Sequence, residues 1–389
     1  MPDSVRPLRV GVYVFFPGGG IGRYTHRLMT ALARHEAVAV EALCTPEYAW
    51  ASAEAYATWP GLARISHRIP ALRRWRFLKG QFVNPKRALE HARTAGLDVL
   101  HLAHINHLSF PYWRRRAERV GVPVVASAHD VTRGKRILSR MWETRQLRAF
   151  YRWADALFVH SAHQVHELEA FAEVAPEAVH VVPHGPYTHG TVSASKAALR
   201  RQWDLPAERP VALMFGKLRD GKNLEGLLRA LARTDASPYL VVAGAEDDRH
   251  RGAAHYRRLA DDLGLGASVR IRPGRLEDPA VGELFVAADW VALPYSASFT
   301  SQSGVLNVAV HYERPVLVSS APVLHETVTA CDIGVACSGD TPAALARGIE
   351  RLHRRLATGH PHAFAAYRDR FSWRENASRT VSVYRSLLA

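Results

Sequence analysis

The chain has 389 residues, of which 48% are hydrophobic, and a formal net charge of +15. This length predicts two domains of roughly 150–200 residues each, and the apolar content excludes a disordered chain. Three scattered cysteines are too few for a disulfide framework. No uninterrupted apolar stretch approaches the roughly 18 residues of a membrane span, and the first residues lack the apolar region of a signal peptide, so we expect a cytoplasmic protein.

Strands alternate with helices through the first half of the chain. Apolar runs rich in β-branched residues predict strands at 8–16, 38–44, 98–104, 122–130, 156–161 and 179–183. Helices are predicted at 23–34, 84–95 and 136–153, and a long loop with short helices at 45–70. Such alternation is typical of a parallel, doubly wound sheet.

The same alternation begins again after a linker at 183–190. Strands are predicted at 211–216, 239–244, 269–272, 290–294, 315–319 and 333–337, and residues 340–389 have only a helical pattern. We therefore expect an α/β protein of two doubly wound domains, 1–187 and 188–372. The loops at the carboxyl ends of their strands are expected to face a ligand-binding cleft.

The most informative segment is 211–232, where an apolar strand leads through a glycine-bounded loop into an amphipathic helix. Lys217, Arg219 and Lys222 lie in this loop, and a helix N-terminus attracts anions, so the segment predicts an anion site. Gly216 and Gly221-Lys222 have the spacing of a nucleotide P-loop. Asn223, however, stands where Ser or Thr would bind Mg²⁺. Metal-free phosphate binding is favoured over an NTPase, and a purely structural turn is the other interpretation.

The glycine run Gly18–Gly22 is a second place where the backbone can approach a ligand closely. It lacks the dinucleotide-binding spacing, although Glu41 follows at the distance of a ribose-binding acid. A dehydrogenase is therefore compatible with this segment, but no other segment supports one.

Hydroxyl and amide groups follow the strand at 290–294. Ser301, Gln302, Ser303 and Gly304 begin a helix, where such groups either cap the helix or bind a sugar or phosphate. Both roles remain open from the residues alone.

The 21 histidines include two triplets at metal-like spacing and one histidine at a strand end. The triplets at 101, 104, 107 and at 160, 163, 166 lack acidic partners, so we predict no metal site. His129, followed by Asp130, is expected at the cleft. It is interpreted either as a substrate contact or general base, or as a structural residue.

Cations and aromatic residues are mixed at 73–79 and 112–116. One interpretation is two solvated helix faces, each with a buried tryptophan. The other is a surface that rests on anionic lipid, with Arg73, Arg74 and Arg76 at the headgroups. A basic P-loop protein that binds nucleic acid is the third, and we expect no nucleic-acid partner.

Five segments, in order, resemble the GT-B-fold glycosyltransferases of the retaining family 4: residues 16–24, 124–130, 181–185, 215–223 and 371–373. The resemblance covers nearly the whole chain. It implies two Rossmann-like domains facing a cleft, with the C-terminal helix at 373–389 crossing back to the first domain. The donor would be a nucleotide-diphosphate sugar, used without metal or cofactor. The acceptor would be a sugar or a lipid-linked sugar in cell-surface polysaccharide or glycolipid synthesis.

The resemblance also implies roles for single residues. Gly19 and Gly20 would approach the donor phosphate, and Gly216, Lys217 and Lys222 would bind the diphosphate. His129 would be the active-site histidine.

One departure from the family pattern concerns the helix near residue 300. Family members commonly have two glutamates eight residues apart, and these positions are Thr300 and Val308 here, with Glu313 at the usual glycine. A subgroup has Ser-Gly-Val-Leu at this place, as at 303–306, which implies that Ser301–Gly304 and the helix N-terminus replace the carboxylates. The alternative function is a nucleotide-sugar-binding protein with impaired catalysis.

Overall fold

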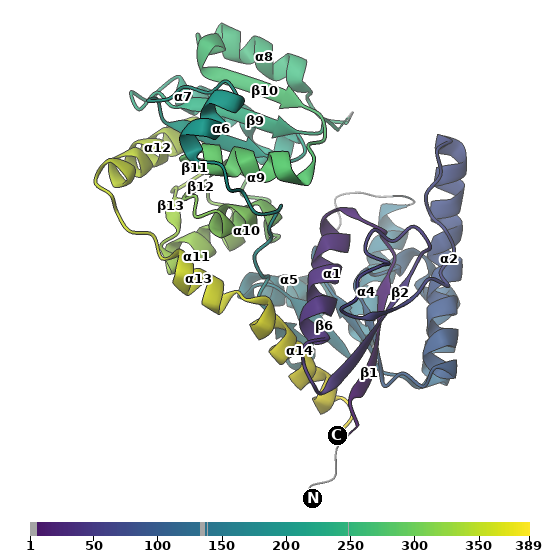
Figure 1. Cartoon of the computed structure of the whole chain (residues 1–389). Helices are drawn as coiled ribbons and strands as arrows, with labels where there is room; N and C mark the ends of the chain where they lie inside the picture. The colour runs from purple at the N-terminus through teal and green to yellow at the C-terminus, as the bar shows by residue number, and fades with distance from the viewer. Residues whose placement is uncertain (1–5, 133–136, 138, 248) are drawn as a thin grey trace, which may run out of the picture. The chain divides into compact units, whose positions relative to one another are not determined.

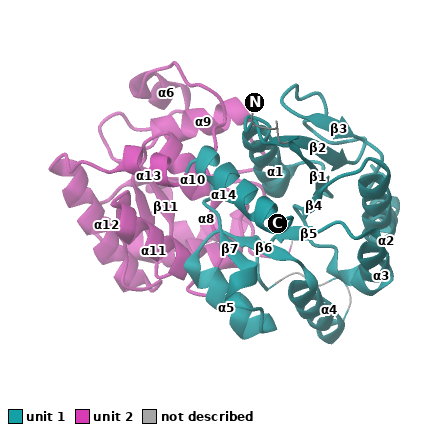
Figure 2. Cartoon of the chain, turned by 90° about the horizontal axis from the view of Figure 1, so that it is seen from below, with its two compact units in different colours: residues 1–184, 372–389 teal, residues 185–371 magenta. Residues whose placement is uncertain are grey.

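The computed structural model describes every residue except 1–5, 133–136, 138 and 248. The chain divides into two compact units, Met1–His184 with Ser372–Ala389 (unit 1) and Gly185–Phe371 (unit 2) (Figure 2). The sequence placed the corresponding boundaries after residues 187 and 372.

Unit 1 contains a seven-stranded parallel sheet (Figure 1). From edge to edge its strands are β3 (Ala57–Trp59), β2 (Val38–Cys44), β1 (Leu8–Val14), β4 (Val99–Leu102), β5 (Val124–Ser127), β6 (Ala156–Val159) and β7 (Val179–Val181). Its α-helices are α1 (Gly19–Leu32), α2 (Pro70–Thr94), α3 (Phe110–Val120), α4 (Arg140–Trp153), α5 (Ala162–Ala172) and α14 (Trp373–Ser386).

Unit 2 contains a six-stranded parallel sheet. Its strands, from edge to edge, are β10 (Val269–Pro273), β9 (Tyr239–Gly244), β8 (Val211–Phe215), β11 (Trp290–Leu293), β12 (Val316–Val318) and β13 (Gly334–Ala336). Its α-helices are α6 (Lys196–Gln202), α7 (Leu224–Leu231), α8 (Ala253–Asp262), α9 (Asp278–Ala287), α10 (Gly304–His311), α11 (Pro322–Cys331), α12 (Pro342–Ala357) and α13 (Phe364–Arg370).

Strand order reverses once in each sheet. In unit 1, β1 lies between β2 and β4, and in unit 2, β8 lies between β9 and β11. At such a reversal the connections leave toward opposite faces, which opens a crevice at the carboxyl ends of the strands. The predicted α/β class with two doubly wound domains is confirmed. The candidate ligand positions are thereby the loops after β1 and β4, and those after β8 and β11.

The C-terminal helix α14 belongs to unit 1, as predicted. Nδ2 of Asn376 donates to the carbonyl of Pro183 at 2.5 Å and to the hydroxyl of Tyr24 at 3.3 Å. The hydroxyl of Tyr384 lies 2.5 Å from Nδ1 of the buried His101. Because an unsatisfied buried polar group is costly, these bonds fix α14 on the unit in a single register.

The sequence did not predict that α2 is one continuous helix. The helix was predicted at 84–95, after a loop with short helices at 45–70, and one interpretation placed a solvated helix face at 73–79. The helix instead begins at Pro70, and β3 lies within the predicted loop. Pro85 has no N–H, so the carbonyl of Gln81 has no donor within the helix, and the hydroxyl of Ser109 donates to it instead. A contact distant in sequence therefore allows the helix to pass through a proline.

The predicted helix at 136–153 is α4, which begins at Arg140, and residues 136 and 138 lie outside the described part of the chain.

Aspartates just before three strands join them to a neighbouring strand. Oδ2 of Asp98 accepts from the N–H of Arg9, at 2.9 Å. Asp155 likewise accepts from Val124 at 2.7 Å, and Asp289 from Val211 at 2.6 Å. In each pair the aspartate N–H donates back to the carbonyl of the same partner. These reciprocal bonds set the register where the parallel strands begin.

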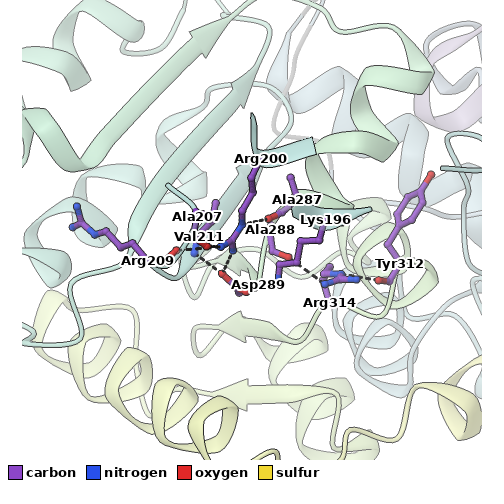
Figure 3. Close-up of polar contacts among 10 residues, drawn as sticks. All are labelled: Lys196, Arg200, Ala207, Arg209, Val211, Ala287, Ala288, Asp289, Tyr312 and Arg314. Carbon is purple, nitrogen blue, oxygen red and sulfur yellow. Dashed lines mark hydrogen bonds and ion pairs between the residues drawn. The ribbon is translucent and has the colours of Figure 1, made fainter. Parts of the chain in front are cut away.

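Asp289 is surrounded by cations, as Figure 3 shows. Its carboxylate also accepts from Lys196 and, at 2.5 Å, from Nη2 of Arg200, whose side chain is only 8% exposed. Arg200 in turn donates to the carbonyl of Ala287 at 3.1 Å. Burial raises the pKa of the Asp289 carboxyl, but the hydrogen bonds from Lys196 and the Val211 N–H outweigh this and hold that pKa below its ordinary value.

We predict that Asp289→Asn lowers the free energy of unfolding of unit 2 by about 3 kcal/mol, because it leaves the buried Arg200 without its counter-charge. Equilibrium urea unfolding measures the change. The matched control is Asp204→Asn, at a carboxylate that is 87% exposed and pairs with Arg270, for which a loss below about 1 kcal/mol is expected. Equal losses in the two variants would contradict the role of Asp289.

The same carboxylate predicts a pH dependence. Since its folded-state pKa is lowered, its contribution is fully present above its unfolded pKa of about 3.8 and declines as pH falls through the lowered folded value. The wild type is therefore expected to lose more unfolding free energy than Asp289→Asn between about pH 5 and pH 2. Parallel pH profiles would contradict this assignment.

Candidate functional site

The loop after β8 contains Gly216, where a side chain would leave no room for Lys222. This residue has a φ of +101°, a left-handed conformation that glycine adopts without strain. Its N–H donates to the carbonyl of Ala243 at 2.9 Å. A Cβ atom here would lie 2.7 Å from Nζ of Lys222. The missing side chain therefore leaves room for the ammonium group of Lys222.

Lys222 is held by neutral groups. Its Nζ donates to the carbonyl of Phe215 at 2.8 Å and lies 5.3 Å from the centre of the Tyr295 ring. Across the described residues no carboxylate forms an ion pair with Lys222. An ammonium group has three N–H donors, of which the carbonyl uses one. The charge is therefore available to an anion at the carboxyl ends of the adjacent strands β8 and β11.

Asn223, in the position of the P-loop hydroxyl, caps α7. Its φ is +56°, its Oδ1 accepts from the N–H of Gly226 at 3.2 Å, and its Nδ2 donates to the carbonyl of Asp340 at 2.8 Å. The side chain thus fixes the loop to two other segments. Within the described part of the chain, no group of three or more His, Cys, Asp or Glu residues is arranged to bind a metal ion.

The loop after β11 joins the loop after β8. The N–H of Ser296 donates to the carbonyl of Gly221 at 3.0 Å, and the N–H of Ala297 donates to Oδ2 of Asp340 at 2.9 Å. Two segments that are about 75 residues apart along the chain are thereby fixed side by side, as expected for adjacent strand ends at an order reversal.

The predicted polar cluster lies where this loop enters α10. Ser303 is buried and occupies the N-cap position, yet its hydroxyl makes no cap bond and lies 3.4 Å from the hydroxyl of Tyr295. Ser301 and Gln302 are half-buried beside it. A Cβ atom on Gly216 would lie 3.8 Å from Val305 in the first turn of α10. The structure therefore brings Gly216, Lys222 and the start of α10 together.

Lys217 differs from Lys222. Its side chain is exposed, and it forms no hydrogen bond or ion pair with the residues that the structure describes. Lys217 is thus an exposed charge that no described neighbour holds, whereas Lys222 is held by a carbonyl and an aromatic ring.

The positions of the expected glutamates provide no carboxylate. Val308 is buried in α10, and Thr300 is half-buried in the preceding loop. Glu313 has a φ of +55°, which explains why glycine is usual there, and its carboxylate pairs with Arg368 at 3.0 Å.

In unit 1 the glycine run forms the start of α1. The helix begins at Gly19, earlier than the predicted 23, and a Cβ atom on Gly19 or Gly20 would meet no atom within 4 Å. A Cβ atom on Gly22 would instead lie 3.2 Å from Trp50, so this glycine serves packing. Glu41, the possible ribose ligand of a dehydrogenase, lies 2.8 Å from Nε2 of His91.

His129 lies shortly after β5 and pairs with His160, which the sequence did not indicate as its partner. Nδ1 of His129 lies 3.1 Å from Nε2 of His160, whose Nδ1 lies 3.1 Å from the carbonyl of Val182. Burial and the neighbouring His129 lower the pKa of His160 to about 3, so His160 is neutral at physiological pH. Because a carbonyl accepts, His160 donates from Nδ1 and accepts from His129 at Nε2. The ring of Tyr24 packs edge-on against His129 at 4.6 Å.

Histidines of the two triplets have different environments. His101 is buried beside Tyr384 and Ser127, and burial lowers its pKa to about 3. His166, in contrast, has a side chain that is 80% exposed.

The two basic, aromatic segments have different structures. Trp113 is 1% exposed, so the segment at 112–116 is a solvated helix face with a buried tryptophan. Trp75 is 57% exposed on α2, where Leu72 and Phe82 are exposed as well. None of the helices in the described part of the chain has the length and apolar character needed to cross a membrane.

Comparison with known proteins identifies the family. Residues 18–188 match the model of Glycosyltransferase Family 4, and residues 195–365 match that of Glycosyl transferases group 1. The chain belongs to glycosyltransferase family 4. The predicted family resemblance is therefore confirmed over both units.

Relatives of this family 4 chain include D-inositol 3-phosphate glycosyltransferases. The one from Streptosporangium roseum is 30% identical over 70% of this chain and 66% of its own length. The one from Streptomyces scabiei is 29% identical over 69% of this chain and 64% of its own length. The matched part spans 58 to 66% of the length of three such relatives.

Solved structures show the GT-B fold of this family 4 chain. Sucrose-phosphate synthase from Thermosynechococcus elongatus has a TM-score of 0.74 and 19% identity, with 98% of this chain and 99% of that chain covered. HepE from Anabaena, solved in complex with UDP, also has a TM-score of 0.74, at 16% identity, with 98% and 100% covered.

Proposed function

We propose that the protein is a retaining glycosyltransferase that moves a sugar from a nucleotide-diphosphate donor to an acceptor hydroxyl without metal or other cofactor. The observation that supports this best is Lys222, which lies beside the start of α10 with no ion-paired carboxylate among the described residues. A diphosphate is the anion that such a site fits, because one fixed cation and helix N–H groups converge there. HepE, which has the same fold, binds UDP.

The proposed reaction exchanges one glycosidic bond for another and moves one proton. The bond between the anomeric carbon and the diphosphate oxygen breaks, and the acceptor oxygen bonds to that carbon on the same face. The acceptor proton passes to an oxygen of the leaving diphosphate. Lys222, Lys217 and the N–H groups of Ser301–Gly304 stabilise the developing charge, each by about 3 kcal/mol. His129 orients the acceptor or the sugar, and in unit 1 the open backbone at Gly19 and Gly20 is the proposed phosphate contact.

The second candidate function is a nucleotide-sugar-binding protein with impaired catalysis. The observation that favours it is the apolar, buried Val308 and the neutral Thr300 at the two positions where glutamates are usual. Such a protein binds the donor but releases no nucleoside diphosphate.

We further propose that the acceptor is lipid-linked and that unit 1 rests on an anionic membrane during polysaccharide or glycolipid synthesis. Unit 1 has 28 Lys and Arg against 16 Asp and Glu, whereas unit 2 has 23 against 20. Residues 55–89 include eight Lys and Arg and no acid. Exposed Arg73 and Arg74 directly precede the exposed Trp75 on α2, and Nζ of Lys79 lies 5.0 Å from the centre of its ring. This mixture of cations and aromatic surface fits lipid headgroups.

Lys222→Ala is predicted to lower the turnover of nucleotide sugar at least about 100-fold, because a fixed positive charge on the leaving group is lost. Release of nucleoside diphosphate over a panel of UDP- and GDP-sugars measures it. Arg258→Ala, at an exposed position on α8, is the control and should retain wild-type turnover. Normal turnover by the Lys222 variant would contradict the site, and donor binding without release by the wild type would establish the second candidate.

With an α-linked donor we predict an α-linked product, whose anomeric proton coupling in NMR spectra reports the configuration. We also predict an unchanged rate in EDTA, because cations of the chain replace the metal. A β-linked product would exclude retention, and a rate lost in EDTA and restored by Mg²⁺ would exclude metal independence.

Replacing Arg73, Arg74 and Arg76 by Gln is predicted to abolish flotation with vesicles that contain anionic phosphatidylglycerol, since each surface cation contributes about 1 kcal/mol near such a membrane. Vesicles of neutral lipid should not bind the wild type. The matched control replaces Arg201, Arg233 and Arg258, three exposed arginines of unit 2, and should float like the wild type. Flotation of both triple variants would contradict the proposed face.

A further inference from the structure

Tyr295, in the loop after β11, contacts both the loop after β8 and the start of α10. It follows β11 after one residue, and its side chain is 3% exposed. Its ring centre lies 5.3 Å from Nζ of Lys222, in the loop after β8, and its hydroxyl lies 3.4 Å from Oγ of Ser303, at the start of α10. One side chain thus lies between the fixed cation and the helix N-terminus.

The ring of Tyr295 is itself fixed. The hydroxyl of Ser319 donates to the backbone carbonyl of Tyr295. The ring of Phe299 packs against it edge-on, with 4.9 Å between the centres and 77° between the planes. The backbone, the ring and the hydroxyl of Tyr295 are therefore each held by a different neighbour, and the ring lies against Lys222.

An aromatic ring holds a cation differently from a carboxylate. The face of the ring attracts the ammonium group through its quadrupole and adds no formal charge. A carboxylate in that place would neutralise Lys222 and compete with an anionic ligand. The carbonyl of Phe215 is neutral as well, so both partners fix the ammonium group and preserve its charge. Since a free lysine side chain loses much rotamer freedom on binding, fixing it in advance favours ligand affinity.

We propose that Tyr295 is a positioning residue for Lys222, whose ring holds the ammonium group at the diphosphate of the donor without neutralising its charge. The inference rests on the proposed function, because it takes a nucleoside diphosphate as the ligand of Lys222. The ring, rather than the hydroxyl, performs this role.

The test is a double-mutant cycle on the binding of UDP and GDP, measured by calorimetry on the full chain. Tyr295→Leu should weaken binding of the preferred nucleotide roughly tenfold, equivalent to about 1.4 kcal/mol. Tyr295→Phe, which keeps the ring, should stay within about twofold of the wild type. In a Lys222→Met background Tyr295→Leu should have no further effect, because the cation that the ring holds is gone.

Tyr239→Leu is the control for loss of a tyrosine ring, at the opposite end of the strands in the same sheet, and should bind like the wild type. Urea unfolding of each variant establishes that it is folded. Three outcomes, in a wild type that binds UDP or GDP, would show that the inference is wrong while the proposed function stands. Tyr295→Leu could have no effect on binding, it could have the same effect in the Lys222→Met background, or Tyr295→Phe could weaken binding as much as Tyr295→Leu. If the wild type binds neither nucleotide, the proposed function fails and the inference with it.

Discussion

The candidate site of unit 2 depends on one constraint of parallel sheets, that all strands end at the same edge. Because strand order reverses between β8 and β11, the loops after these two strands meet, although long stretches of chain separate them. The hydrogen bond from Ser296 to Gly221 holds the two loops together. Because Gly216 has no side chain, the ammonium group of Lys222 has room beside it. Lys222 is thereby brought to the start of α10.

Charged groups have different partners at the two ends of the strands in this sheet. Where the strands begin, the carboxylate of Asp289 is compensated by Lys196 and Arg200, which stabilises the fold. Where they end, Lys222 is held by a carbonyl and an aromatic ring. A charge that is balanced within the chain contributes to stability, whereas one that is fixed but unbalanced is available to a ligand. The family to which the chain belongs makes a donor diphosphate the proposed ligand.

Sequence patterns predicted most of the fold and much of the candidate site. The strand runs, the glycine loops and the loop at 216–223 depend on residues adjacent along the chain, so they are visible in the sequence. The continuity of α2 through Pro85 was missed, because the carbonyl of Gln81, which Pro85 leaves without a donor, is satisfied by Ser109, which is distant in sequence. Tyr295 and His160 were missed as partners of Lys222 and His129 for the same reason, although Tyr295 directly follows one predicted strand and His160 lies within another.

By itself, the sequence determined the doubly wound architecture, the family and the identity of the cations, since these follow from local periodicity and motif spacing. The tertiary structure decided how each charge is used. It placed Lys222 against neutral partners and left Lys217 exposed, although the two lysines lie in one loop. It also used the amide of Asn223 as a helix cap and the hydroxyl of Ser303 as a neighbour of Tyr295. The physical reason is that the availability of a charge or a hydrogen-bonding group depends on contacts between segments that only the folded sheet brings together.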